Sequence, residues 1–146
     1  MDFELSVKLA VYRHFAETGE RPSAAEIGAR VGAPVERVLE AYRRLRAQRV
    51  LVLDPDGGSI RMAPPFSGVP TQHVVVAEGL SYFANCAWDS LGVAAALGKP
   101  AVVYSRCEQS KQPLRLAVSQ AGPEPSDWLF HCAVPAARWW DDIVFT

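Results

Sequence analysis

Ser81-Tyr82-Phe83-Ala84-Asn85-Cys86-Ala87-Trp88-Asp89-Ser90-Leu91-Gly92 is the stretch of this 146-residue sequence on which the fold prediction depends. The stretch predicts a helix over residues 81–97. Residues at positions i and i+3 share one face of a helix, so we expect Cys86 and Asp89 to lie side by side. A thiolate binds soft metals, and a neighbouring carboxyl group can transfer a proton. This pair is suited to capturing a soft metal and cleaving a bond to it.

Runs typical of β-strands flank this helix on both sides. We expect Ser81 to cap the helix and Gly98 to end it. Glycine and proline residues separate the strand-like runs, as turn residues do. The predicted strands cover residues 73–77, 101–104, 114–118 and 128–134. The natural assembly of these elements is a helix packed on a small, mainly antiparallel sheet.

Residues 1–62 predict a winged helix-turn-helix, which makes the fold class α+β. A first helix carries apolar residues at helical spacing, and two more helices are expected at about 23–30 and 34–48. Ser23 and Glu26 have the spacing of a capping box at the start of the second helix. A two-stranded wing follows, and the proline-rich residues 63–72 form a connector to a catalytic domain over residues 73–146.

The helix over residues 34–48 raises the question of DNA binding. It is rich in arginine, but residues 1–62 contain ten Lys and Arg against nine Asp and Glu. A nearly neutral domain lacks the excess positive charge that phosphate binding requires, and fold alone does not fix function. We therefore expect a structural or lid role for this half and keep a winged-helix transcriptional regulator as an alternative. The arginines concerned are Arg37, Arg43, Arg44, Arg46 and Arg49.

Composition limits the other classes of function. The net charge of the whole chain is −1, and 49% of its residues are hydrophobic. No apolar run approaches the roughly 20 residues that cross a bilayer, and the first residues lack the pattern of a signal peptide. We expect a cytoplasmic protein with no membrane partner. Its three cysteines, Cys86, Cys107 and Cys132, are then expected to be free thiols.

The whole arrangement resembles the alkylmercury lyase (organomercurial lyase) family, whose members split the carbon–mercury bond. Three segments carry the resemblance. The winged-helix entry matches at residues 21–39, the catalytic segment at residues 83–91, and a further family cysteine, usually given a structural role, at Cys107. The Cys-x-x-Asp element indicates this family only in combination with the other two matching segments.

The resemblance implies a mechanism. Cys86, as a thiolate, would bind the mercury of an organomercurial, and Asp89 would relay a proton to the departing carbon. A position early in a helix would help to keep the thiol ionised. No cofactor is expected, mercury is substrate or product, and an external thiol is expected to release it. The ligand class is a small organomercurial or another thiol-reactive molecule.

One position departs from the family pattern. The family's second mercury-binding cysteine is expected just beyond a segment like residues 135–140, and the chain ends there, at Thr146. We interpret the sequence as an incomplete or a degenerate member of the family. Cys107, Cys132 or a small-molecule thiol could supply the second sulfur. A catalytically silent homologue that binds a soft metal through Cys86 stays a second alternative.

Overall fold

The computed structural model describes residues 1–145 and begins with three α-helices. They are α1 (Phe3–Thr18), α2 (Ala24–Val31) and α3 (Val35–Ala47). The predicted capping box is confirmed at the start of α2. The Ser23 side chain accepts a hydrogen bond from the Glu26 N–H, and the Glu26 carboxylate accepts one from the Ser23 N–H.

A small antiparallel sheet follows the helices. Its order is β1-β2-β3, with β1 (Val52–Leu53), β2 (Ile60–Ala63) and β3 (Phe66–Ser67). Part of the stretch that we expected to be a connector is therefore a buried strand. Because Ala63 pairs with Phe66, the two residues between them form the turn that joins β2 to β3.

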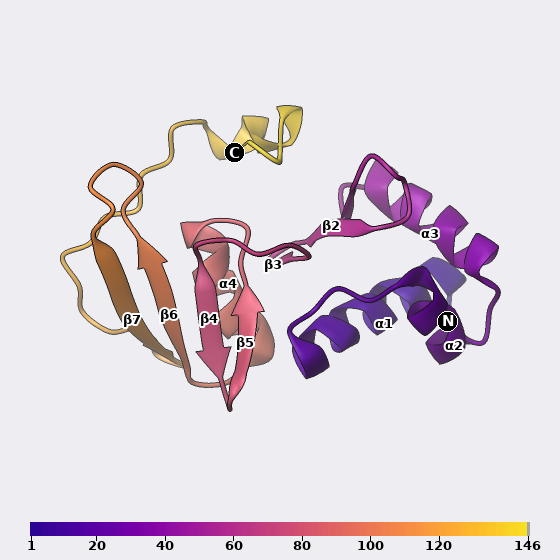
Figure 1. Cartoon of the computed structure of the whole chain (residues 1–146), viewed down its shortest axis with the longest axis horizontal. Helices are drawn as coiled ribbons and strands as arrows, with labels where there is room; N and C mark the ends of the chain where they lie inside the picture. The colour runs from indigo at the N-terminus through magenta and orange to yellow at the C-terminus, as the bar shows by residue number, and fades with distance from the viewer. Residues whose placement is uncertain (146) are drawn as a thin grey trace.

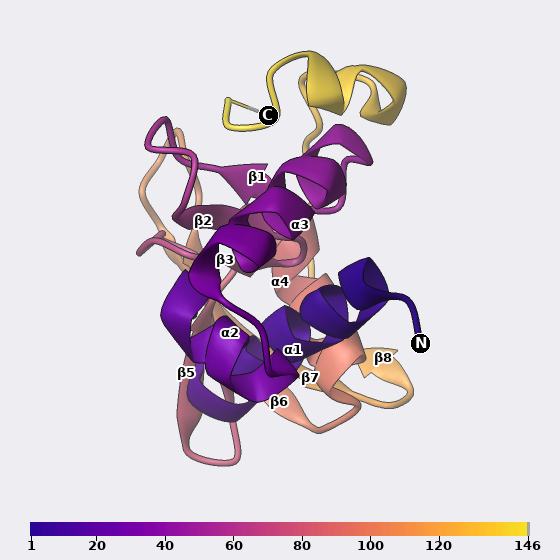
Figure 2. The ribbon, with the colours of Figure 1, turned by 90° about the vertical axis from the view of Figure 1, so that its right-hand side faces the viewer.

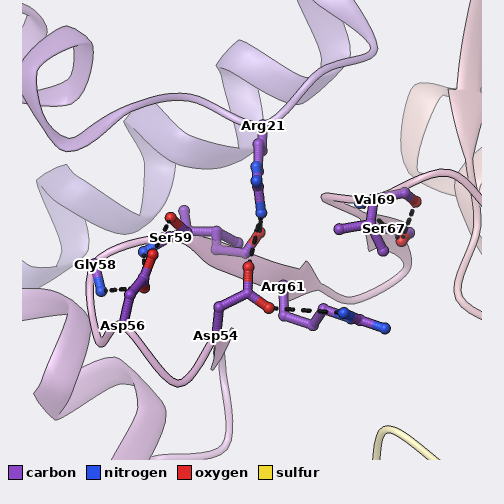
Figure 3. Close-up of polar contacts among 9 residues, drawn as sticks. Arg21, Asp54, Asp56, Gly58, Ser59, Arg61, Ser67 and Val69 are labelled. Carbon is purple, nitrogen blue, oxygen red and sulfur yellow. Dashed lines mark hydrogen bonds and ion pairs between the residues drawn. The ribbon is translucent and has the colours of Figure 1, made fainter.

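Ion pairs connect the segment just before α2 to this sheet (Figure 3). The Asp54 carboxylate accepts a hydrogen bond from Arg21 at 2.9 Å and also lies 3.7 Å from the Arg61 guanidinium. The neighbouring Asp56 carboxylate accepts hydrogen bonds from the backbone N–H groups of Gly58 and Ser59 and closes the β1–β2 loop. The helices and the small sheet thus pack as one unit.

The second sheet has the order β5-β4-β6-β7-β8, and every neighbouring pair is antiparallel. Helix α4 (Ala87–Leu97) packs against β4, β6 and β7 on one face. Figure 1 shows α1–α3 to one side of this sheet, and Figure 2 shows the same helices in front of it. The strands are β4 (Val74–Ala77), β5 (Leu80–Phe83), β6 (Ala101–Arg106), β7 (Pro113–Ser119) and β8 (Gly122–Pro123).

The helix predicted over residues 81–97 begins too early in the sequence, because α4 starts only at Ala87. Leu80–Phe83 is β5, which pairs with β4 through a two-residue turn at Glu78 and Gly79. Both turn residues have positive φ angles, 49° and 80°, as the tight turn of a β-hairpin requires. Ser81 is therefore a strand residue, and Cys86 caps α4 instead. The end of the helix at Gly98 is confirmed.

The strand predicted over residues 128–134 is absent from the structure. Pairing with β7 ends at Pro123, and the chain then runs without a strand or helix to a 3₁₀ turn at Ala136–Asp141. The next N–H of β7, that of Ala117, donates to the Glu124 side chain, and Pro125, which follows, has no N–H to donate to a strand ladder. One contact of the segment is with α4: the Phe130 ring lies 5.7 Å from the Trp88 ring.

Within residues 1–145, no helix is long and apolar enough to cross a membrane. The buried apolar side chains form one cluster that includes residues of both sheets and of α1–α4.

Candidate functional site

The structure brings Cys86 and Asp89 together at the start of α4. Cys86 is the N-cap residue, with extended backbone angles (φ −150°, ψ 177°), and its sulfur accepts a hydrogen bond from the Asp89 N–H at 3.4 Å. The expected proximity is thus present, although capping geometry produces it rather than a shared helical face. Both residues are half-buried. Their catalytic roles stay a prediction.

Burial dominates the acid–base behaviour of the Cys86 thiol. Desolvation raises the pKa of Cys86, while the hydrogen bond from the Asp89 N–H lowers it and the negative charge of Asp89 raises it. The helix N-terminus therefore helps the thiolate, as we expected, but the burial of the sulfur outweighs that help. The thiol must lose its proton when a metal binds.

Burial also affects the carboxyl group of Asp89. Burial raises the pKa of Asp89 above the ordinary aspartate value, and hydrogen bonds that involve Asn85 and Cys86 lower it in part. A carboxyl group with a raised pKa keeps its proton to higher pH, which suits a proton donor. The site thus pairs a thiol with an acid on one turn of backbone.

Two further side chains, those of Asn85 and Tyr12, and the turn that they bond border the site, and sequence reasoning missed them. The Asn85 amide donates to the carbonyls of Pro65 and Phe66, both at 3.2 Å. The Tyr12 hydroxyl, from α1, donates to the Pro64 carbonyl at 3.0 Å. We name residues 64–66 the Pro64–Phe66 turn. A buried tyrosine hydroxyl, such as that of Tyr12, usually forms a hydrogen bond, but the sequence does not reveal which group accepts it.

Cys107 lies at the same end of the large sheet as Cys86. It follows β6, whereas Cys86 follows β5, and β4 lies between these two strands. Its sulfur accepts a hydrogen bond from the Ser110 N–H at 3.5 Å. Hydrogen bonding by Ser110 and then by the Gln109 backbone lowers the pKa of Cys107, with a smaller contribution from the charge of Lys111.

Cys132 is exposed, and its thiol donates to the Val134 carbonyl. Within residues 1–145, no three His, Cys, Asp or Glu side chains are grouped so that they could hold a metal ion. The structure therefore does not assemble Cys86 with the other two cysteines into a single metal site.

A histidine–serine pair lies at the same end of the sheet. His73 Nδ1 is 2.7 Å from Ser105 Oγ, and burial lowers the pKa of His73. The two residues are 32 positions apart, and they meet because β4 and β6 are antiparallel neighbours. Nothing in the local sequence pattern indicates this pairing.

Comparisons with known proteins agree with this geometry. The alkylmercury lyase family model matches residues 66–146. Alkylmercury lyases of Bacillus cereus and Clostridium butyricum are each 27% identical over 100 residues. That match covers 68% of this chain and 44% of each relative, so the chain spans less than half of their length.

A solved structure has a similar fold. The crystal structure of the mercury-bound form of MerB2 superposes with a TM-score of 0.62 at 19% identity, over 85% of this chain and 66% of the other. The mixed architecture of helices and antiparallel sheet is thus shared with that protein. Because the family model covers more than half of the sequence, this chain belongs to the alkylmercury lyase family.

Proposed function

We propose that this protein cleaves the carbon–mercury bond of organomercurials, with Cys86 as the mercury-binding thiol and Asp89 as the proton donor. The observation that carries the proposal is the Cys86 sulfur at the N-cap of α4, 3.4 Å from the Asp89 N–H, in a chain of this family. Membership in the family and the names of the curated relatives support the substrate class.

The reaction would take place in two steps. First, the Cys86 thiol releases its proton to solvent and its sulfur binds the mercury of R–Hg⁺, which is favoured because thiolates bind soft metals far better than oxygen ligands do. Second, protonated Asp89 gives its proton to carbon. The electron pair of the C–Hg bond becomes the new C–H bond, R–H leaves, and Hg²⁺ remains on sulfur. Asp89 then regains a proton from solvent.

The raised pKa of Asp89 supports the second step, because the group must still carry its proton when mercury is bound. A second sulfur would weaken the C–Hg bond further and then remove the product. Cys107 and Cys132 stay candidates for that sulfur, but we favour an external thiol, since neither cysteine is grouped with Cys86. The proposed reaction uses no other cofactor.

We also propose that the first half is a winged helix-turn-helix that serves the enzyme and does not bind DNA. Two arginines of α3 are already engaged within the chain. Arg44 pairs with Glu4 at 3.3 Å, and the Arg37 guanidinium lies 4.1 Å from the centre of the Phe3 ring. These contacts reduce the charge available to phosphate groups. Free cysteines fit a reducing cytoplasm, which we propose as the location.

The test is to incubate the protein with phenylmercury and excess thiol and to measure benzene by gas chromatography. Wild type should form benzene, whereas Cys86→Ser and Asp89→Asn should not. The two variants separate the roles in a Cys107→Ser, Cys132→Ser background, where Asp89→Asn should still bind phenylmercury stoichiometrically and Cys86→Ser should not. Wild-type binding of mercury without benzene would instead favour the silent homologue. Absence of both would refute the proposal.

A further inference from the structure

We propose that Tyr12 is a positioning residue for the Cys86–Asp89 site and that it acts from the first helix through the Pro64–Phe66 turn and Asn85. The inference rests on the proposed function for its meaning in catalysis. It adds a role for the N-terminal half that neither the family match, which begins at residue 66, nor the sequence pattern assigns.

The first link joins α1 to the turn. Tyr12 is about midway along α1, and its hydroxyl donates to the Pro64 carbonyl at 3.0 Å across 52 residues of sequence. The Tyr12 ring also lies 6.3 Å from the Phe66 ring, in an edge-on arrangement. One end of the turn is thus held by a hydrogen bond and the other by an aromatic contact, both from the same side chain.

The second link joins the turn to the site. Asn85, immediately before the N-cap, donates to both remaining carbonyls of the turn, those of Pro65 and Phe66. The Pro65 ring lies against Gly92 of α4, where an added Cβ would be 3.1 Å from the Pro65 Cβ. Little space is left between the turn and the middle of α4, and the hydrogen bonds of Asn85 tie the same turn to the residue before the N-cap.

Tyr12 is also close enough to the site for the charge of Asp89 to affect its pKa. Burial, with a smaller contribution from the negative charge of Asp89, raises the pKa of Tyr12 to about 12. The hydroxyl of Tyr12 therefore stays protonated and stays a hydrogen-bond donor throughout the neutral range. Asn85, which bonds two carbonyls of the turn, also takes part in a hydrogen bond with the Asp89 carboxyl group.

The chain offers a matched control. The Tyr82 hydroxyl donates to the Ala16 carbonyl at 2.7 Å, so it too joins α1 to the rest of the molecule through one tyrosine–backbone hydrogen bond. That bond involves no carbonyl of the Pro64–Phe66 turn. Tyr12→Phe and Tyr82→Phe therefore remove the same kind of hydrogen bond, each worth about 1 kcal/mol of stability, but only the first removes a hydrogen bond to the turn. The Tyr82 ring, which lies 5.9 Å from the Phe66 ring, is retained in Tyr82→Phe.

The experiment compares these two variants with wild type by two readouts. The first is kcat and KM for phenylmercury cleavage. The second is the rate of Cys86 alkylation by iodoacetamide in a Cys107→Ser, Cys132→Ser background, which requires no lyase activity. Because misplacing a reactive group by about 1 Å can cost up to ~100-fold in rate, we expect Tyr12→Phe to lower kcat about tenfold with KM nearly unchanged. We expect Tyr12→Phe also to change the alkylation rate at least about threefold, with Tyr82→Phe at the wild-type value in both assays.

If the two variants changed kcat and the alkylation rate equally, Tyr12 would be an ordinary structural contact and the proposal would be overturned. The same conclusion would follow if neither variant changed these two quantities. If wild type formed no benzene, the proposed lyase function would fail, but the alkylation rates would still decide whether Tyr12 positions the thiol.

Discussion

Replacing Phe66 with alanine should destabilise both halves of the chain together. Phe66 is 2% exposed, and its ring lies 5.3 Å from Phe15, 5.9 Å from Tyr82 and 6.3 Å from Tyr12. Removing a buried phenylalanine costs about 3–5 kcal/mol, from the lost burial and the cavity that remains. The free energy of unfolding of a domain is only about 5–15 kcal/mol, so the variant should lose a large share of it.

Urea unfolding followed by two probes tests this prediction. The tryptophans, Trp88, Trp128, Trp139 and Trp140, all lie in the second half, so their fluorescence reports on that half. The far-ultraviolet circular dichroism signal comes largely from α1–α3 in the first half. Because the buried cluster is continuous between the halves, the two curves should coincide and should shift together in the variant.

Phe130→Ala is the matched control, since it removes the same side chain from a site that is 48% exposed. Its contact with Trp88 is worth about 0.5–1.5 kcal/mol, so its effect should be clearly smaller. The reasoning would be refuted if Phe66→Ala moved the urea midpoint no further than Phe130→Ala did. Separate fluorescence and dichroism transitions in the wild-type protein would refute it as well.

Three other predictions concern the capping box, the thiol and the close contact at α4. Ser23→Ala should lower the free energy of unfolding by about 1 kcal/mol, because the Glu26 N–H loses its acceptor, and urea denaturation measures this. Since burial raises the pKa of Cys86, the rate of Cys86 alkylation by iodoacetamide in the Cys107→Ser, Cys132→Ser background should climb with pH and level off only above the pKa of an ordinary cysteine; a profile that levels off below it would contradict the assignment. Gly92→Ala should reduce the rate of benzene formation by crowding Pro65, and the same crowding should offset the gain in helix propensity of up to ~1 kcal/mol, so that urea denaturation shows no increase in the free energy of unfolding.

Local signals in the sequence predicted the local features well. The Ser23–Glu26 spacing predicted the start of α2, because both partners of a capping box lie within one turn of the chain. Gly98 predicted the end of α4 for a similar reason, since the residue adopts a left-handed conformation, with φ 62°, that favours glycine. In each case the stabilising contact is made by residues close in sequence.

The errors arose where contacts between distant residues decided the structure. Residues 81–83 are helix-compatible in isolation, yet the turn at Glu78 and Gly79 folds them back onto β4. Residues 128–134 have the composition of a strand but lack a paired edge after Pro123, and Leu129 is 90% exposed. Strand formation requires a partner strand, and a single segment does not specify that partner.

The difference between local and long-range contacts also explains the outcome for Cys86 and Asp89. The two residues were correctly expected to lie close together, although their helix was predicted to begin too early. An N-cap side chain reaches the backbone N–H of the third helical residue, so Cys86 and Asp89 meet whether the helix begins at Cys86 or well before it. The spacing of three is sufficient in both cases. Tyr12 and Asn85 have no such local relation to one another, because the Pro64–Phe66 turn connects them. The proximity of Cys86 and Asp89 is thus specified locally, whereas the surroundings of the pair require the complete fold, including a helix from the first half of the chain.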